Sequence, residues 1–555
     1  MDKKTLADSL SSITPLIDTI VQPEIRSAMI ALLNLIESLA HENEQQRQTI
    51  QTLKDENNRL KGEQGQPSIR PQTPTDTTSH SSEEDRKKRQ KKRKPKKRLK
   101  KKEVIKADRQ VRLELDPSTL PADAQYKGRQ STIIQDLKIV TDNIEFLRDV
   151  YYSPSLNKTF MVELPKGYEG EFGPNVKVSI ITLYHEANMT QPALKRFLNA
   201  AGLVISKATI SRMLTDKHEV FHQEKEAILD AGLQAPYQQT DDTGARVNGK
   251  NYHVHILCNP FFTAYFTRHK KDRLTLLEIL CRDELKFSIN EETLALLKKM
   301  GLPEKLLKKV ANFQQQEALT RSEINAMLLQ FFPNPKKQQS NRRRILEASA
   351  LIYYYHLPHS LKHLMCDDAP QFNMIAKYKS LCWIHEGRHY KKLSPIVPSH
   401  QKILEDFREK FWDYYQSLLD YTDHPSPDAA TQLDAEFNRL FSAKTGYDEL
   451  DKRIKLTAEK KEALLMPLKF PFLPLHNNDA ENGAQHQARS RDIHLQTKNE
   501  KGTRAKDTFA TLVKTARKLN VNLFDYFYDR ITKTFSMPSL ASLILEKCGV
   551  RPNTS

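Results

Sequence analysis

The chain has 555 residues but little cysteine and no long apolar run. Its cysteines are scattered and form no Cys-x-x-Cys pair; they stand at positions 258, 281, 366, 382 and 548. This spacing argues against a disulfide framework and a structural zinc ribbon, and fits thiols kept reduced in the cytoplasm. The N-terminus lacks the pattern of a secretory signal peptide, and no window is apolar enough to span a bilayer. We therefore expect a soluble protein without a membrane partner.

Positive charge, in contrast, is abundant, with a formal net charge of +18. Residues 86–102 hold fourteen basic residues and no acid, and begin with Arg86, Lys87, Lys88 and Arg89. Without those fourteen charges the remainder of the chain carries only +4. Like charges at this density cannot pack together, so the run predicts a solvated segment. Its expected function is sequence-independent attraction to DNA phosphates that weakens with salt.

Residues 29–60 show a heptad repeat with two apolar seams, typical of a coiled coil. Asparagines in the first seam favour a parallel homodimer, because each is best satisfied by its twin. The alternative is an amphipathic helix packed on its own chain, and Gln46 weakens the second seam. The first seam contains Met29, Ile36, Asn43, Ile50 and Asn57, and the second contains Leu32, Leu39, Gln46, Leu53 and Leu60.

Periodicity and composition predict an α/β protein in six parts. The fold of the small mixed segment at 111–170 cannot be deduced from the sequence. The parts are a coiled-coil helix at 1–61, a linker with the basic run at 62–110, the mixed segment at 111–170, a helical region at 171–233, an α/β core at 234–500 with helical insertions at 283–358 and 396–468, and C-terminal helices at 501–555.

The helical region contains two short helices joined by a turn at Gly202, with Ser206 as the N-cap of the second. This pattern is typical of a helix-turn-helix that reads double-stranded DNA, although a plain helical bundle fits equally well. The DNA-facing residues of the second helix would be Lys207, Thr209, Ser211 and Arg212.

A basic-zipper transcription factor is a second reading of the N-terminal half. In that class the basic helix precedes the zipper and forks directly from it. Here the basic run follows the heptads across a linker rich in Pro, Ser and Gly, so the order is wrong.

Carboxylates stand at three places where an element begins or ends. Asp241 and Asp242 precede a glycine and a strand-like run, and Asp367 and Asp368 follow the apolar run 361–366. Glu481 lies in the first turn of a predicted helix whose N-cap would be Asn478 or Asp479. Turn-capping aspartates and a dipole-favoured glutamate would explain each in isolation. A cluster of carboxylates can also hold two Mg²⁺ ions for phosphodiester chemistry.

These segments resemble the motifs of insertion sequence 66 family transposases. The resemblance implies an RNase H-like mixed-sheet core with an Asp-Asp-Glu triad, here Asp241, Asp367 and Glu481, binding two Mg²⁺ or Mn²⁺ ions. Asp242 and Asp368 are second-rank ligands. The matching segments are Asp241-Asp242-Thr243-Gly244, Asp367-Asp368-Ala369-Pro370, Cys382-Trp383-Ile384-His385 and Asn477-Asn478-Asp479-Ala480-Glu481.

The resemblance also implies a function and partners. The chain would be a nucleoid-associated bacterial transposase that binds terminal inverted repeats as a homodimer and catalyses DNA cleavage and strand transfer, in some cases with accessory proteins of the same element. A catalytically silent DNA-binding relic or regulator is the alternative. The chain departs from the family in lacking the Cys-x-x-Cys module after the linker and in its long helical stretch before Asp367.

Other residues near the proposed centre have weaker assignments. Arg388, Arg489 and Arg491 could hold DNA, although solvated helix faces explain the last two equally well. Cys382, His385 and His389 have a spacing that could suit zinc, but packing on a helix is favoured, so we predict no structural zinc.

Overall fold

The computed structural model describes Leu10 and residues 21–60, 106–113, 115, 129–334 and 337–549. Most of the predicted linker and the whole basic run, with Arg86, Lys87, Lys88 and Arg89, lie outside the described residues. The chain divides into two compact units. The first comprises residues 1–70, 163–194 and 206–555, and the second comprises residues 71–162 and 195–205.

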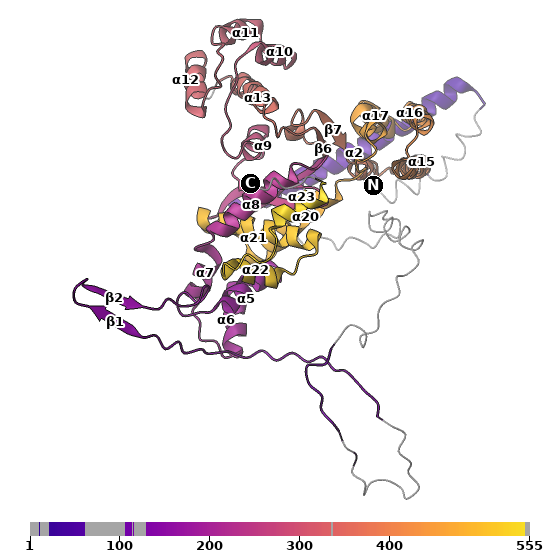
Figure 1. Ribbon diagram of the computed structural model, residues 1–555. Helices are drawn as coiled ribbons and strands as arrows, with labels where there is room; N and C mark the ends of the chain where they lie inside the picture. The colour runs from indigo at the N-terminus through magenta and orange to yellow at the C-terminus, as the bar shows by residue number, and fades with distance from the viewer. Residues whose placement is uncertain are drawn as a thin grey trace, which may run out of the picture. The chain divides into compact units, whose positions relative to one another are not determined.

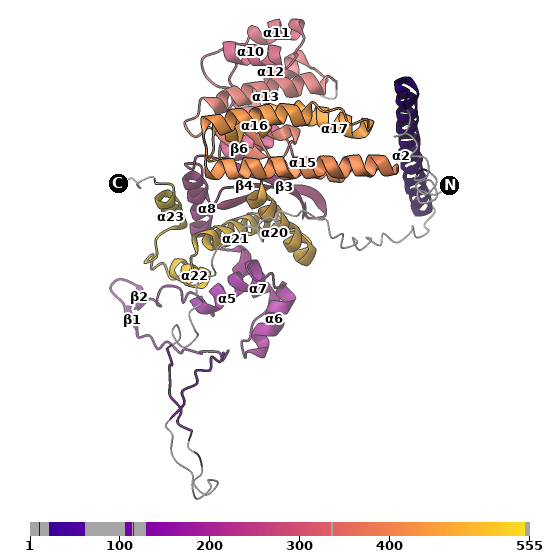
Figure 2. The same ribbon diagram turned by 90° about the vertical axis from the view of Figure 1, so that its right-hand side faces the viewer.

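A mixed five-stranded sheet organises the first unit; Figure 1 labels β6 and β7, and Figure 2 labels β3 and β4. Its order is β5-β4-β3-β6-β7, with β3 antiparallel to β4, β4 antiparallel to β5, and the pairs β3–β6 and β6–β7 parallel. The α/β class predicted from the sequence is thus confirmed. The strands are β3 (Gln238–Val247), β4 (Lys250–Cys258), β5 (Thr263–Arg268), β6 (His363–Cys366) and β7 (Tyr378–Leu381).

The β3–β4 hairpin sets which faces its acidic side chains occupy. Asn248 and Gly249 form a two-residue turn with φ of 47° and 76°, the left-handed pair that matches the twist of a hairpin. The resulting register pairs Asp241 with Ile256 and Asp242 with His255. Because successive side chains of a strand point to opposite faces, Asp241 and Asp242 belong to different sides of the sheet.

Two C-terminal helices, α20 (Asn478–His494) and α21 (Glu500–Leu519), pack against the sheet. Gly483 permits the close approach of α20, because a Cβ there would lie 3.0 Å from Ile256 Cγ2. Asp507 on α21 accepts hydrogen bonds from the Thr267 backbone N–H and hydroxyl, at 2.6 and 2.7 Å. The sheet layer therefore extends beyond the predicted core boundary at residue 500.

Helical insertions flank β6 and β7. Before β6, helices α10 to α13 lie together in both views (Figures 1 and 2), and further helices follow β7. These positions agree with the predicted insertions. The helices are α9 (Arg273–Leu280), α10 (Glu291–Lys299), α11 (Glu304–Ala311), α12 (Arg321–Phe331), α13 (Gln339–Tyr355), α14 (Trp383–Lys391), α15 (Pro398–Asp423), α16 (Pro427–Phe441), α17 (Asp448–Ala458), α18 (Lys461–Leu464) and α19 (Met466–Lys469).

Short helices precede the sheet at the predicted positions, and Ser206 caps α7 by accepting from Thr209 N–H. Residues 195–200 of α6 belong to the second unit, so the helix-turn-helix arrangement stays a prediction. The second unit also contains an antiparallel hairpin within the mixed segment. These elements are α5 (Pro174–His185), α6 (Gln191–Ala200), α7 (Lys207–Thr215), α8 (Glu219–Gly232), β1 (Val150–Ser153) and β2 (Lys158–Met161), and the chain closes with α22 (Leu523–Ile531) and α23 (Leu540–Lys547).

The predicted coiled-coil segment is one helix, α2 (Pro23–Leu60). Its first half packs on its own chain: Leu33 is buried against Val397, and Glu37 accepts hydrogen bonds from the Ile396 and Val397 backbone N–H groups at 2.7 and 3.0 Å. Of the seam residues, Met29 and Ile36 pack against this cluster, whereas Leu32, Leu39, Ile50 and Leu53 stay exposed. The alternative of a helix packed on its own chain describes the first half of α2, and the coiled-coil dimer stays a prediction. No helix among the described residues is long and apolar enough to cross a membrane.

Candidate functional site

The register of the central strands brings the first two predicted ligands to one edge. Gln238 pairs with Leu364 and Gln239 with Met365 in the parallel β3–β6 ladder. The ladder ends at this pair, and Asp241 and Asp367 each follow it by two residues, so both lie beyond the same end of the ladder. Asp241 is half-buried and accepts from the Asp242 backbone N–H at 2.7 Å.

Glu481 reaches the same edge from the first turn of α20. The start of this helix is fixed to β3 because the Asn477 side chain donates to the Thr240 carbonyl at 2.8 Å, one residue before Asp241. The predicted N-cap at Asn478 or Asp479 is wrong. Asn477 occupies that position, and its amide contacts β3 rather than capping the helix.

Asp241 has an acidic environment. Burial raises the pKa of Asp241 to about 7, and the negative charges of Asp367, Asp242 and Glu481 act in the same direction. A carboxylate whose ionisation is opposed by neighbouring acids is stabilised by a cation placed among them.

The second-rank acids have lysine partners instead. Asp242, whose side chain is only 4% exposed, lies 2.6 Å from Lys271 Nζ and accepts from Gln371 Nε2 at 2.9 Å. Asp368 lies 2.8 Å from Lys460 Nζ and 3.4 Å from Lys379 Nζ.

These contacts separate the two classes of acid. Burial tends to raise the pKa of Asp368, but the hydrogen bond and charge of Lys460 outweigh it and the pKa falls below its usual value. Among the described residues, no Lys, Arg or His forms an ion pair with Asp241 or Asp367.

Arg388 on α14 binds Glu481 in this structure. Its Nη2 donates to Glu481 Oε2 at 2.7 Å, and its Nη1 lies 3.1 Å from His385 Nε2. His385 Nδ1 lies 3.4 Å from Glu481 Oε1. Burial lowers the pKa of His385, although the Glu481 charge opposes the shift. Arg388, predicted to touch DNA, is therefore engaged with a carboxylate.

Cys382 stands beside this pair at the start of α14. Its buried sulfur accepts from the Asn477 backbone N–H at 3.3 Å, and burial raises the pKa of the thiol to about 11. Ligand atoms of Cys382, His385 and Glu481 all lie within 4.8 Å of one another. Glu481, rather than the predicted His389, is thus the third possible metal ligand beside Cys382 and His385.

The other predicted DNA-binding residues lie on different elements. Arg491 of α20 donates to the Gly244 carbonyl at 2.6 Å, so this side chain supports β3, while Arg489 is exposed. On α7 the side chains of Lys207 and Arg212 are exposed, whereas Thr209 and Ser211 are half-buried. Arg212 Nη2 donates to Thr209 Oγ1 at 3.3 Å.

The three predicted ligands suit a hard divalent cation in their chemistry. Each offers carboxylate oxygens, and Glu481 Oε1 is buried without a hydrogen-bond partner. Their oxygens do not all lie within 4.8 Å of one another, as they would around a single ion. Two ions about 3.5–4 Å apart accommodate such a wider set.

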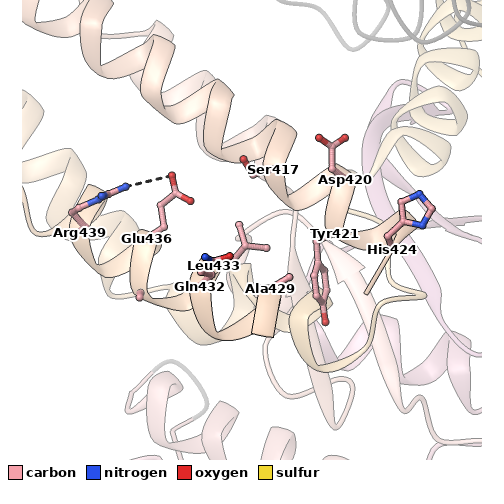
Figure 3. Close-up of a pocket in the computed structure, with 10 residues that line it drawn as sticks. Ser417, Asp420, Tyr421, His424, Ala429, Gln432, Leu433, Glu436 and Arg439 are labelled. Carbon is pink, nitrogen blue, oxygen red and sulfur yellow. Dashed lines mark ion pairs between the residues drawn. The ribbon is translucent and has the colours of Figure 1, made fainter. Parts of the chain in front are cut away.

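A groove of about 850 Å³ lies elsewhere, between α15 and α16 (Figure 3). Asp420 and His424 line it from α15, and Glu436 pairs with Arg439 on α16. None of the sequence-predicted site residues lines this groove, so it contributes nothing to the carboxylate site.

Comparison with known proteins gives a relative without a described activity. No family model matches the chain. Over 309 residues the chain is 29% identical to the uncharacterized protein y4jO of Sinorhizobium fredii, a match that covers 55% of this chain and 94% of the relative.

Proposed function

We propose that the protein is a transposase of the Asp-Asp-Glu type that cleaves and joins DNA at the ends of a mobile element. The observation that carries this proposal is the convergence of Asp241, Asp367 and Glu481 beyond one end of the β3–β6 ladder, where burial, together with the neighbouring negative charges, raises the pKa of Asp241. A structural role would favour cation partners for Asp241 and Asp367, as their neighbours have.

The sheet supports an RNase H-like core. It is mixed, its two central parallel strands carry the first two acids, and the third acid comes from a helix packed on the same sheet. Asp241 and Asp367 each follow the last β3–β6 pair by two residues, so the hydrogen-bond ladder anchors the backbone that carries them, as a rigid ligand frame requires.

Asp241, Asp367 and Glu481 would hold two Mg²⁺ or Mn²⁺ ions. When bound, these ions supply Lewis-acid stabilisation of charge on the phosphodiester oxygens and activation of the attacking hydroxyl or water. The chain positions the ligands: Asn477 fixes α20 on β3, and the Lys271–Asp242 pair braces the opposite face of the strand. Arg388 balances the charge of Glu481 and has an exposed side chain that could turn to a DNA phosphate.

DNA and a second copy of the chain are the proposed partners. The net charge of +18 favours DNA, and the exposed Lys207 and Arg212 on α7 favour contact there. Exposed Leu39, Ile50 and Leu53 on α2 support a coiled-coil homodimer, because apolar seam residues gain burial by pairing.

The test uses labelled DNA that carries the sequences flanking the coding region, incubated with purified protein and Mg²⁺. We expect cleavage and strand transfer by the wild type, and a loss of at least about 1000-fold for Asp241→Ala, Asp367→Ala and Glu481→Ala, since each removes an ion ligand. Full strand transfer by any of the three would contradict the triad.

Binding to the labelled ends is measured in parallel by gel shift. Wild-type protein that binds the ends but does not cleave them in Mg²⁺ or Mn²⁺ would favour the DNA-binding relic. The Arg388–Glu481 pair is the feature that gives this alternative weight, because it neutralises a proposed ligand.

A further inference from the structure

A thiol, an imidazole and a carboxylate meet beside the proposed magnesium centre. Cys382 and His385 come from the first turn of α14, and Glu481 comes from the first turn of α20. One ligand atom from each lies within 4.8 Å of the other two, and this is the single such group among the residues that the structure describes. Two helix starts fixed on one sheet edge therefore create a mixed sulfur, nitrogen and oxygen donor set.

Two atoms of this group have no hydrogen-bond partner among the described residues. His385 Nδ1 and Glu481 Oε1 are buried and make no hydrogen bond among the described residues, although they face each other at 3.4 Å. A buried polar atom without a partner is costly, and a bound ion is one of its ordinary explanations.

The spacing suits a tetrahedral ion. Zinc takes thiolate sulfur at about 2.3 Å and imidazole nitrogen or carboxylate oxygen at about 2.0–2.2 Å, which places neighbouring ligands about 3.4–3.6 Å apart. The His385–Glu481 separation of 3.4 Å already meets this value. The sulfur lies within 4.8 Å of both atoms, so it needs an approach of at most about 1.4 Å.

We propose that Cys382, His385 and Glu481 form a site for a thiophilic divalent cation of the zinc class, with a fourth position open to solvent. The thiolate selects such ions over Mg²⁺, which prefers oxygen ligands. On binding, the Cys382 thiol would release its proton to solvent, and the ion would lie between the unpartnered His385 Nδ1 and Glu481 Oε1.

Arg388 disfavours metal binding at this site. When Nδ1 of His385 is a ligand, Nε2 carries the proton and cannot accept from Arg388, which now lies 3.1 Å away. A cation beside Glu481 also repels the guanidinium. The Arg388 side chain is 47% exposed and can turn into solvent. Removing it should therefore strengthen metal binding.

The consequence for activity rests on the proposed function. Glu481 would be a ligand of both sites, so an ion held by Cys382 and His385 draws Glu481 away from magnesium. Zinc-class ions would then inhibit strand transfer by competition for one carboxylate.

The experiment titrates the full-length protein with Co²⁺, which takes zinc ligands and gives a thiolate-to-metal charge-transfer band. We expect one ion per chain with this band. Cys382→Ser should abolish the band and weaken binding at least tenfold, whereas Cys548→Ser, which changes a cysteine outside the group, should leave both unchanged. Arg388→Gln should tighten binding severalfold. A wild-type band that persists in Cys382→Ser would overturn the site.

Two further measurements test the metal site, one by metal affinity and one by inhibition of strand transfer. His385→Gln, checked for folding by circular dichroism, should also lose affinity at least tenfold, and unchanged Co²⁺ affinity in this variant would overturn the site. Zn²⁺ added to the Mg²⁺ strand-transfer assay should inhibit the wild type and spare Cys382→Ser. Cobalt binding does not depend on DNA cleavage, so an inactive wild type that shows the band would contradict the proposed function alone. Equal inhibition of both proteins would overturn the shared role of Glu481.

Discussion

Two adjacent aspartates lie within β3 and two more follow β6 directly, and in each pair the two residues have opposite surroundings. Asp242 and Asp368 lie against lysines, at 2.6 and 2.8 Å, whereas Asp241 and Asp367 form no ion pair among the described residues. The difference follows from the strand geometry, because adjacent side chains face opposite sides of a sheet. One side meets cationic side chains, and the other meets more carboxylates.

This comparison separates structural acids from acids that await a cation. A carboxylate paired with lysine is already compensated and gains little from a metal ion. A carboxylate surrounded by acids, as Asp241 is, destabilises the fold until a cation arrives. Four predictions test this distinction, in order of decreasing effect.

The largest effect concerns catalysis within one pair. Asp367→Asn should lower the rate of Mg²⁺-dependent strand transfer at least about 1000-fold, because it removes a ligand of the ions. Asp368→Asn should stay within about tenfold of the wild type, since its partners are lysines. Strand-transfer rates on the flanking DNA give the comparison. Equal losses in both variants would show that the two aspartates share the role.

The second effect concerns stability. Asp242→Asn should lower the free energy of unfolding by about 1.5–3 kcal/mol, because it breaks a pair whose carboxylate is buried and leaves Lys271 without its partner. We place the value below that of a fully buried pair because the Lys271 side chain is 41% exposed. Urea unfolding followed by circular dichroism measures it. A change in the free energy of unfolding below experimental error would contradict a stabilising role of this ion pair.

The third effect has the opposite sign. The folded pKa of Asp241, about 7, is above its value in the unfolded chain, so the folded state binds the extra proton and loses stability as pH rises from about 4 through 7. Asp241→Asn should therefore be more stable than the wild type at pH 8 without divalent ions, by about 1–2 kcal/mol, and equal to it near pH 4.

Magnesium provides the control for that prediction. Adding Mg²⁺ at pH 8 should stabilise the wild type and change the Asn variant less, because the ion binds the folded carboxylates. Urea unfolding of both proteins at the two pH values, with and without Mg²⁺, gives the free energies of unfolding to be compared. A variant that is less stable than the wild type at pH 8 would refute the assignment of Asp241 to the uncompensated class.

The smallest effect is expected at Asp368. Its side chain is 40% exposed and its lysine partners are partly solvated, so Asp368→Asn should cost below about 1 kcal/mol of unfolding free energy. High salt should reduce the difference further, since screening weakens exposed pairs. A larger loss that salt does not alter would mean that the residue acts through hydrogen bonds rather than charge.

Much of the fold could be predicted from the sequence because its signals are local. Alternation marks β4, apolar periodicity marks both helical insertions, and the heptads mark α2. The glycine that follows Asp241 and Asp242 lies inside β3, and the hairpin turn falls at Asn248 and Gly249 instead. The boundary at residue 500 misplaced α21, since a helix that packs on β5 through Asp507 and Thr267 carries no local sign of its partner. The N-cap of α20 was misjudged for the same reason, because the Asn477 amide is committed to β3.

The sequence by itself determined the α/β class, because hydrophobic periodicity is read along the chain, and the candidate acids came from the resemblance of their segments to transposase motifs. Only the tertiary structure decided which aspartate of each pair has a lysine partner, that Arg388 binds Glu481, and that Cys382 and His385 share that same glutamate. These outcomes depend on side chains separated by tens to hundreds of residues. Two charged side chains attract each other strongly only when they lie within a few ångströms. Strand register and helix packing bring them that close, and neither can be read from the local sequence.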